Sequence, residues 1–273
     1  MKRSALCLAA FALLLPCLAA AHDLWIEPST FRPAAGDDVT AALRVGQKLH
    51  GEPLPRIPML IDRFVLKGKG AESPVEAEPG ADPAGSARVS EAGLHWIGYQ
   101  SHPYAVALEA RKFEAYLRDE GLERIVEERA RKGRSGAPGR ERFYRCAKSL
   151  LEARGEKHAA RSGVFDVPLG LTLELVPRKS PYAVRPGGVL PLSLLFRGKP
   201  VANVLVVAMS KQDPEKAVSA RTDARGLVTL RLAHAGFWLV KAVYMEAAPP
   251  DAGVDWESWW ASITFDLPGG PGQ

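Results

Sequence analysis

Six short apolar stretches in the C-terminal part of the chain decide the fold: LTLELVP (171–177), VLPLSLLF (189–196), ANVLVVAM (202–209), GLVTLRL (226–232), FWLVKAVYM (237–245) and SITFDL (262–267). They are rich in leucine, β-branched and aromatic residues, and turn sequences such as RPGG (185–188) and TDARG (222–226) separate them. Their number and spacing are typical of an immunoglobulin-like β-sandwich. We therefore predict a C-terminal sandwich over residues 164–268 and a disordered tail over 269–273.

The N-terminal part has a similar pattern. Its strand-like stretches are HDLWIEP (22–28), DDVTAALRVG (37–46), RFVLKG (63–68), GLHWIGYQ (93–100) and YAVALEA (104–110). Segments 51–58 and 71–85, rich in proline, glycine and glutamate, are typical of loops. Residues 22–108 are therefore predicted to form a first sandwich.

Between these parts, segment 109–163 has the spacing of helices. Apolar residues recur three and four positions apart in three stripes: Phe113, Tyr116 and Leu117; Leu122, Ile125 and Val126; and Phe143, Ala147, Leu150 and Leu151. The predicted fold class is therefore mainly β, with two immunoglobulin-like β-sandwich domains and an inserted segment of about three short α-helices.

The positive charge of the chain is concentrated in this inserted segment. Residues 111–161 hold fifteen Lys and Arg against nine Asp and Glu, an excess of six, while the whole chain has a net charge of +5. Pairs such as Glu120–Arg124 and Glu127–Arg131, four residues apart, favour a solvated helical face. We therefore predict no nucleic-acid partner.

The first residues are typical of an export signal. Lys2 and Arg3 precede an apolar run, and Ala19 to Ala21 offer a small-residue cleavage site, so residues 1–21 are predicted to be removed in transit to a periplasm. No later apolar run reaches the roughly 18 residues that a membrane span needs. Only Cys146 lies outside the signal, which excludes an intramolecular disulfide in the mature chain.

Cleavage after Ala21 would make His22 the first residue, whereas cleavage after Ala20 would leave Ala21 in front of it. A terminal histidine can chelate a metal ion through its α-amino nitrogen and imidazole Nδ1. Their ordinary pKa values, about 7.7–8.0 and about 6.5, leave a divalent ion little proton competition near neutral pH. Nickel, cobalt and copper suit such ligands. The candidate metal ligands are His22, His95 in the strand-like stretch at 93–100, and His102 just after it.

The sequence also bears on two other kinds of site, a catalytic site and a sugar-binding platform. The sequence contains no G-x-S-x-G, H-E-x-x-H, C-x-x-C or phosphate-loop motif, which favours a protein without catalytic activity. Trp256, Trp259 and Trp260 could form a platform for a sugar, but their spacing favours packing in the core.

Several longer stretches carry a resemblance to a known family: HDLWIEPS (22–29), AGLHWIGYQS (92–101), ERFYRCAKSLLEARG (141–155) and DWESWWASITFDL (255–267). With these, the chain resembles exported accessory proteins of nickel and cobalt uptake (NikK-like), filed as a domain of unknown function. The resemblance implies a periplasmic metal-binding protein that works beside a membrane metal transporter. Two alternatives stay open: a CopC-like copper carrier that uses its N-terminal histidine, and a metal-free immunoglobulin-like module that binds a membrane protein or a glycan.

Overall fold

The computed structural model describes residues 22–155 and 164–269. Its elements before the gap are β1 (Asp23–Pro28), β2 (Asp38–Gln47), β3 (His50–Leu54), the 3-10 helix η1 (Pro58–Leu60), β4 (Ile61–Lys67), β5 (Glu72–Pro74), β6 (Gly85–Arg88), β7 (Gly93–Ser101), β8 (Tyr104–Leu108), α1 (Ala110–Asp119), α2 (Glu123–Arg131) and β9 (Gly139–Ala153). After the gap come β10 (Leu173–Pro177), η2 (Pro181–Ala183), β11 (Gly188–Phe196), β12 (Lys199–Pro200), β13 (Leu205–Ser210), β14 (Asp213–Arg221), β15 (Leu227–Leu232), β16 (Gly236–Ala247) and β17 (Trp256–Leu267). The prediction of a mainly β fold is confirmed.

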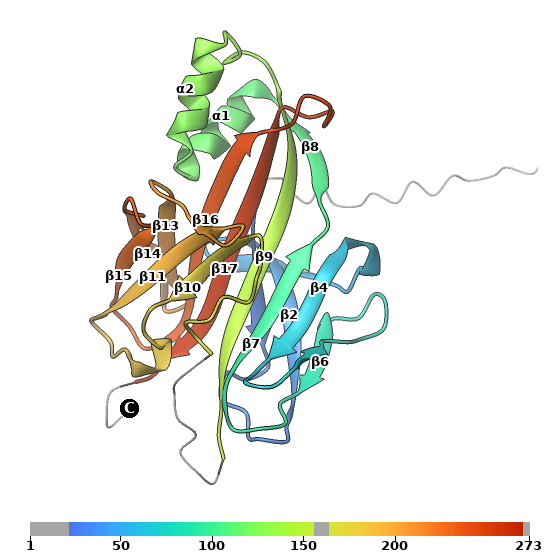
Figure 1. Cartoon of the computed structure of the whole chain (residues 1–273), viewed down its shortest axis with the longest axis vertical. Helices are drawn as coiled ribbons and strands as arrows, with labels where there is room; N and C mark the ends of the chain where they lie inside the picture. Colours follow the sequence, from blue (N-terminus) through green and yellow to red (C-terminus); the bar gives the residue numbers. More distant parts are fainter. Residues whose placement is uncertain (1–21, 156–163, 270–273) are drawn as a thin grey trace, which may run out of the picture.

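A large sheet joins strands from both halves of the chain (Figure 1). Among the described residues it has nine strands, in the order β14-β13-β16-β17-β9-β7-β4-β5, with β8 also paired to β9. Its central neighbours β17 and β9 run parallel. Two smaller sheets complete the fold: the first small sheet contains β1, β2, β3 and β6, and the second contains β10, β11, β12 and β15.

The two small sheets cover opposite faces of the large sheet, so the large sheet is shared by two sandwiches. Ala147 and Leu151 of β9 belong to the core under the first small sheet. Cys146 and Leu150, which alternate with them, belong to the core under the second small sheet. The predicted segments 22–108, 109–163 and 164–268 all contribute strands to the large sheet.

The third predicted helix is wrong, because the residues of its stripe lie in strand β9. Phe143, Ala147, Leu150 and Leu151 are all buried, and the 15-residue strand pairs with β7 on one edge and with β17 on the other. A central strand with both faces buried has apolar residues at odd and even positions. Those positions can include a chance spacing of three and four, which is the pattern of a helix.

Strand β1 crosses the large sheet on the face covered by the first small sheet. Ser262 Oγ donates a hydrogen bond to the Leu24 carbonyl at 2.7 Å, and Thr264 Oγ1 donates one to the Ile26 carbonyl at 2.8 Å. Both hydroxyls are buried on β17. Strand β1 is therefore held by side-chain hydrogen bonds in addition to its backbone pairing with β2.

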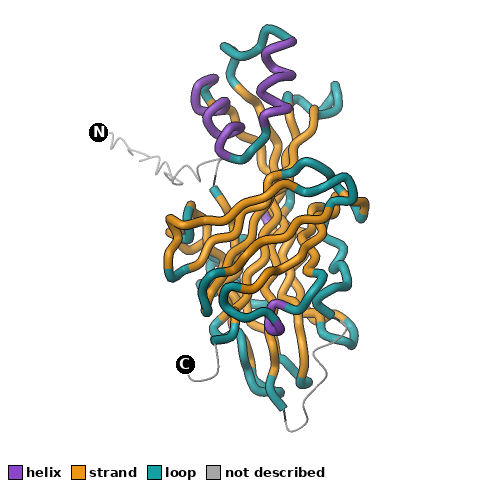
Figure 2. The backbone as a smooth tube through the Cα atoms, turned by 90° about the vertical axis from the view of Figure 1, so that its left-hand side faces the viewer, coloured by secondary structure: helices purple, strands orange, loops and turns teal. Residues whose placement is uncertain are grey.

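The two helices cover the far end of the same face of the large sheet. Phe113, Tyr116 and Leu117 of α1 form a core with residues of α2 and with Trp256 and Trp260 of β17. Figure 2 shows both helices at one end of the strands. No helix within residues 22–155 and 164–269 is long and apolar enough to span a membrane.

A buried ion pair connects the large sheet to the segment that enters the second small sheet. Lys148 Nζ lies 2.6 Å from Glu174 Oε1, and both side chains are 1% exposed. The Glu174 carboxylate also accepts backbone N–H groups of Leu169, Gly170 and Leu171 at 2.6, 2.8 and 3.1 Å. Lys148 Nζ lies 4.2 Å from the ring centroid of Trp96, which adds a cation–π contact.

We expect Glu174→Ala to lower the free energy of unfolding more than Lys148→Met does. The first change leaves a buried ammonium ion without its carboxylate and three N–H groups without an acceptor, at a cost of about 3–5 kcal/mol or more. The second leaves Glu174 its three backbone donors and costs less. Chemical denaturation followed by tryptophan fluorescence measures both. Exposed Lys211→Met is the control, with a cost below about 1 kcal/mol, and equal losses in the two core variants would contradict the asymmetry.

Candidate functional site

His22, at the start of the described chain, is half-buried and directly precedes a buried junction between β1, the end of α1 and the large sheet. The residue after it, Asp23, is 4% exposed, and Asp23 Oδ1 lies 2.8 Å from Nζ of Lys241 on β16. The same Nζ donates to both carboxylate oxygens of Glu120, at 2.8 and 3.0 Å. We call Asp23, Glu120 and Lys241 the N-terminal junction.

Burial dominates the electrostatics of this junction. It raises the pKa of Asp23, and it raises that of Glu120 to about 7, against the opposing attraction of Lys241 in both cases. Burial would lower the pKa of Lys241, but the two carboxylates outweigh it and raise that pKa. Arg145 on β9 is also buried and adds a second positive charge near Asp23. Two acids and two bases therefore balance each other here, and an added cation at the carboxylates would compete with Lys241.

His95 lies away from this junction. It is 4% exposed on β7, its Nδ1 is 3.2 Å from the Gly93 carbonyl oxygen, and burial lowers its pKa. In the sheet it is paired with Leu151, six positions along β9 from Arg145. At about 3.3 Å per residue, His95 lies about 20 Å from the junction along the strand.

His102 lies closer to the junction. It is exposed, and its backbone N–H donates to the Leu60 carbonyl at 2.9 Å. The preceding residue, Ser101, accepts a hydrogen bond on Oγ from the backbone N–H of Arg145 at 3.0 Å. Across residues 22–155 and 164–269, no group of three or more His, Cys, Asp or Glu side chains is placed to hold one metal ion. The structure therefore does not bring His22, His95 and His102 together as one three-histidine group.

A buried carboxylate beneath α1 was missed by the sequence analysis. Glu141 is fully buried, and its Oε1 accepts hydrogen bonds from Tyr116 Oη at 3.0 Å and from Ser258 Oγ. Burial raises the pKa of Glu141 to about 7. In the sequence Glu141 stands between Arg140 and Arg142, a context typical of a solvated charge, so no local signal indicated its burial.

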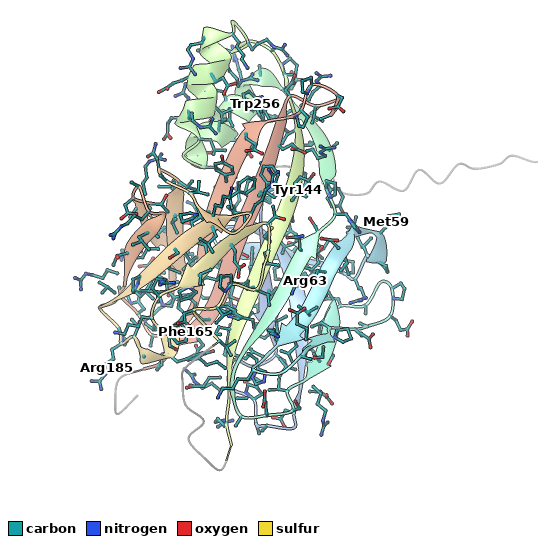
Figure 3. All side chains as sticks on the ribbon, viewed as in Figure 1. Met59, Arg63, Tyr144, Phe165, Arg185 and Trp256 are labelled. Atoms are coloured by element: carbon teal, nitrogen blue, oxygen red, sulfur yellow. The ribbon has the colours of Figure 1, made fainter. Side chains whose placement is uncertain are left out.

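Aromatic rings gather where the large sheet extends beyond the second small sheet. The rings of Tyr144 and Trp259 are stacked with centroids 5.3 Å apart, and Phe196 packs against Trp259 at 4.6 Å and against Tyr244 at 4.7 Å. Trp259 is buried, whereas the other three rings are partly exposed. We call Tyr144, Phe196, Tyr244 and Trp259 the aromatic surface, and Figure 3 labels Tyr144 on it.

Charged side chains border the aromatic surface. Arg197 Nη2 lies 3.5 Å from Glu246 Oε1, and the Arg197 guanidinium lies 4.5 Å from the Phe196 ring centroid. On the other side, Arg142 donates hydrogen bonds to Glu257. The surface thus combines exposed ring area with carboxylate acceptors and guanidinium donors.

The tryptophans singled out in the sequence are core residues. Trp256, Trp259 and Trp260 are 4%, 2% and 5% exposed, which confirms the packing interpretation. Cys146 is 1% exposed, and burial raises the pKa of its thiol to about 12. It therefore behaves as an apolar core residue.

The comparison with protein families gives one match. The profile of a domain of unknown function, DUF4198, matches residues 19–246. The chain belongs to this family. No curated protein matches this DUF4198 chain.

Solved structures give weak likenesses. The DUF4198 chain is similar to the D0-D1 domain of Intimin at 13% identity and a TM-score of 0.22, over 89% of this chain and 97% of that one. It is similar to a tetra-tandem repeat in the extending region of a large adhesion protein at 15% identity and a TM-score of 0.20, over 90% of this chain and 50% of that one. At these scores neither likeness bears on function.

Glu141 should make stability depend on pH. Because its pKa is about 7 in the folded chain and 4.5 when unperturbed, the folded state keeps a proton that the unfolded state loses between those values. This stabilisation is complete below pH 4.5 and is lost as the pH rises through about 7. Its magnitude is at most about 3 kcal/mol.

We therefore expect wild-type protein to lose more stability than Glu141→Gln between about pH 5 and pH 8, since the amide does not titrate. Denaturation midpoints across this range measure the difference. Glu215→Gln, at an exposed glutamate on β14, is the matched control and should follow the wild-type curve. Parallel curves for wild type and Glu141→Gln would show that Glu141 is ionised in the fold at acidic pH.

Proposed function

We propose that this protein is a non-catalytic, exported, immunoglobulin-like interaction module that binds a glycan through the aromatic surface. The observation that carries the proposal is the stretch of β9, β16 and β17 that continues beyond β10 and β11 toward the helices (Figure 1). On that stretch, partly exposed Tyr144 and Tyr244 lie beside buried Trp259, and partly exposed Phe196 at the end of β11 packs against Tyr244 and Trp259. The export signal supports a periplasmic location, where cell-surface glycans are present.

The chemistry of the aromatic surface suits a sugar. The flat faces of aromatic rings can pack against the C–H groups on one face of a pyranose, and few polar groups are then needed to fix its orientation. Glu246 and Glu257 offer hydrogen-bond acceptors to hydroxyl groups, and Arg197 offers donors. The helices support the other face of the same strands, which keeps the rings in fixed positions.

We expect Tyr144→Ala and Tyr244→Ala each to weaken glycan binding about tenfold, because each removes a ring of the surface. Screening against an array of bacterial cell-surface oligosaccharides finds the ligand, and calorimetry then gives the affinities. Tyr104→Ala removes a partly exposed tyrosine that stacks on Phe143 outside the surface and should bind as wild type does. Absence of any glycan ligand, or equal weakening by Tyr104→Ala, would exclude the proposal.

A second candidate function is favoured by the attachment of β1. Because hydrogen bonds from β17 fix β1 just after His22, a terminal His22 would present its α-amino and imidazole nitrogens at a fixed place. We propose that such a chelate binds nickel or cobalt for a membrane transporter, or copper as a CopC-like carrier does. His102 and His95 were predicted as further ligands, and His102 is the nearer of the two to the junction.

The metal proposal is tested by one added residue. Protein secreted with its native terminus is compared with a form that carries an extra alanine before His22, which breaks the chelate and leaves every side chain in place. We expect stoichiometric nickel, cobalt or copper binding by the native form, measured by calorimetry and elemental analysis, and a loss of at least tenfold in the extended form. Equal affinities of the two forms would rule out the terminal chelate, and His102→Ala tests the third ligand.

A further inference from the structure

A pocket lies between the end of α2 and the loop that joins β16 to β17, on the side of the helices away from the N-terminal junction. Its volume is about 300 Å³, at the lower end of the range for small-ligand sites. The polar residues that line it are Arg129, Lys132, Arg134, Arg140, Asp255 and Trp256. Figure 3 labels Trp256 at this end of the molecule.

Two buried donors at this pocket lack an acceptor. Arg129 and Trp256 are 2% and 4% exposed. Within the part of the chain that the structure describes, neither Arg129 Nε nor Trp256 Nε1 has a hydrogen-bond partner. A buried N–H group without an acceptor costs about 1–3 kcal/mol, and more for a charged group. Both residues line the pocket, so an acceptor bound there is one way to satisfy these donors.

The rest of the Arg129 guanidinium is already fixed. Arg129 Nη2 donates to the carbonyls of Arg134 and Ala137, at 2.9 and 2.6 Å. These bonds tie the loop after α2 to the helix. The guanidinium also lies 4.8 Å from the ring centroid of Phe113, so it is held between the loop and the helical core. Its unpartnered Nε is therefore a preorganised donor.

The charges around the pocket favour an anion. Asp255 accepts hydrogen bonds from Arg140 Nε and Nη2 at 3.2 and 3.1 Å, and it lies 3.5 Å from Arg134 Nη2. Lys132 Nζ lies 2.8 Å from Glu128 Oε1, a pair of residues four apart on α2. With Arg129 included, four positive side chains face these two carboxylates, so an excess of two positive charges remains.

We propose that this pocket binds a tetrahedral oxyanion, the phosphate or sulfate group of a small molecule or of a lipid headgroup. Such a group carries several acceptor oxygens at once, so it can pair with Arg129 Nε and Trp256 Nε1 together. Arg134 and Arg140 have half-exposed side chains at the mouth and contribute charge-assisted hydrogen bonds. The site is separate from the aromatic surface and does not depend on the glycan proposal.

The test uses the indole N–H signal of Trp256 in ¹⁵N NMR spectra of the full mature chain, assigned by its loss in Trp256→Phe. Inorganic phosphate, inorganic sulfate and vesicles are titrated separately, with phosphatidylglycerol vesicles compared with phosphatidylcholine vesicles. We expect the Trp256 signal to shift with saturation. Saturation by the inorganic ions identifies a free or small-molecule oxyanion, and a response to phosphatidylglycerol vesicles alone identifies a lipid headgroup.

Two variants separate the site from general charge effects. Arg134→Gln/Arg140→Gln should weaken binding at least tenfold, whereas the control Arg178→Gln/Arg185→Gln removes two exposed charges elsewhere and should leave it unchanged. Asp255→Asn removes the acidic residue of the pocket lining while keeping an acceptor oxygen for Arg140, and should tighten binding several-fold. A gain of affinity cannot come from unfolding. No shift of the Trp256 signal with any probe, or equal weakening by both double variants, would overturn the proposal.

Discussion

The buried ion pair between Lys148 and Glu174 holds the second small sheet against the large sheet. Lys148 lies near the centre of β9, and its side chain extends into the core of the second sandwich. There it pairs with Glu174, whose carboxylate also accepts hydrogen bonds from three backbone N–H groups. A buried carboxylate with four donors is fully satisfied, whereas Lys148 without Glu174 would be a buried ammonium ion with no acceptor. The pair therefore fixes residues 169–171 and the start of β10 against β9, and the second small sheet is positioned from that point.

The large sheet is covered on both faces, and this determines which residues its central strand can carry. Because the small sheets pack on opposite faces, β9 is buried on both sides along most of its length, and its buried charges need partners. At the end of β9 nearer the helices, the second small sheet no longer covers its face of the strand, and Tyr144 lies on that face, stacked on Trp259. The aromatic surface thus lies where the second small sheet ends, with Phe196 at the end of β11 and the helices packed behind the large sheet.

The sequence alone predicts most of the long strands, including β7 and β10, which are buried on both faces, but it fails for β9. Strand β15 alternates buried residues with more exposed ones and is predicted from this pattern. Strand β9 does not alternate, so its stripe was read as a helix. Strand β14 was also missed, since DPEKAVSAR lies at a sheet edge with no fully buried residue.

The candidate sites differ in whether their sequence signal is local or comes from distant parts of the chain. His22 could be singled out because it directly follows the predicted cleavage site, which is a local feature. The junction below it could not, since Asp23, Glu120 and Lys241 come from three distant parts of the chain. The predicted pair Glu120–Arg124 is wrong for this reason: Glu120 turns inward to Lys241, while Arg124 donates to the Met245 carbonyl. A spacing of four indicates proximity, but a buried partner of opposite charge competes more strongly.

The basic segment shows how composition misleads when burial is unknown. Its excess of positive charge was predicted to lie on solvated helical faces, and the ion pairs Glu114–Arg118 and Glu128–Lys132 are of that kind. However, Arg145 and Lys148 are buried in the large sheet, and Arg129 is buried at the pocket. A buried guanidinium persists only where its donors are satisfied or where a ligand supplies the missing acceptor. Arg145 and Lys148 lie close to buried acids, whereas Nε of Arg129 has no acceptor within the described residues. This difference supports the proposed anion site in the pocket.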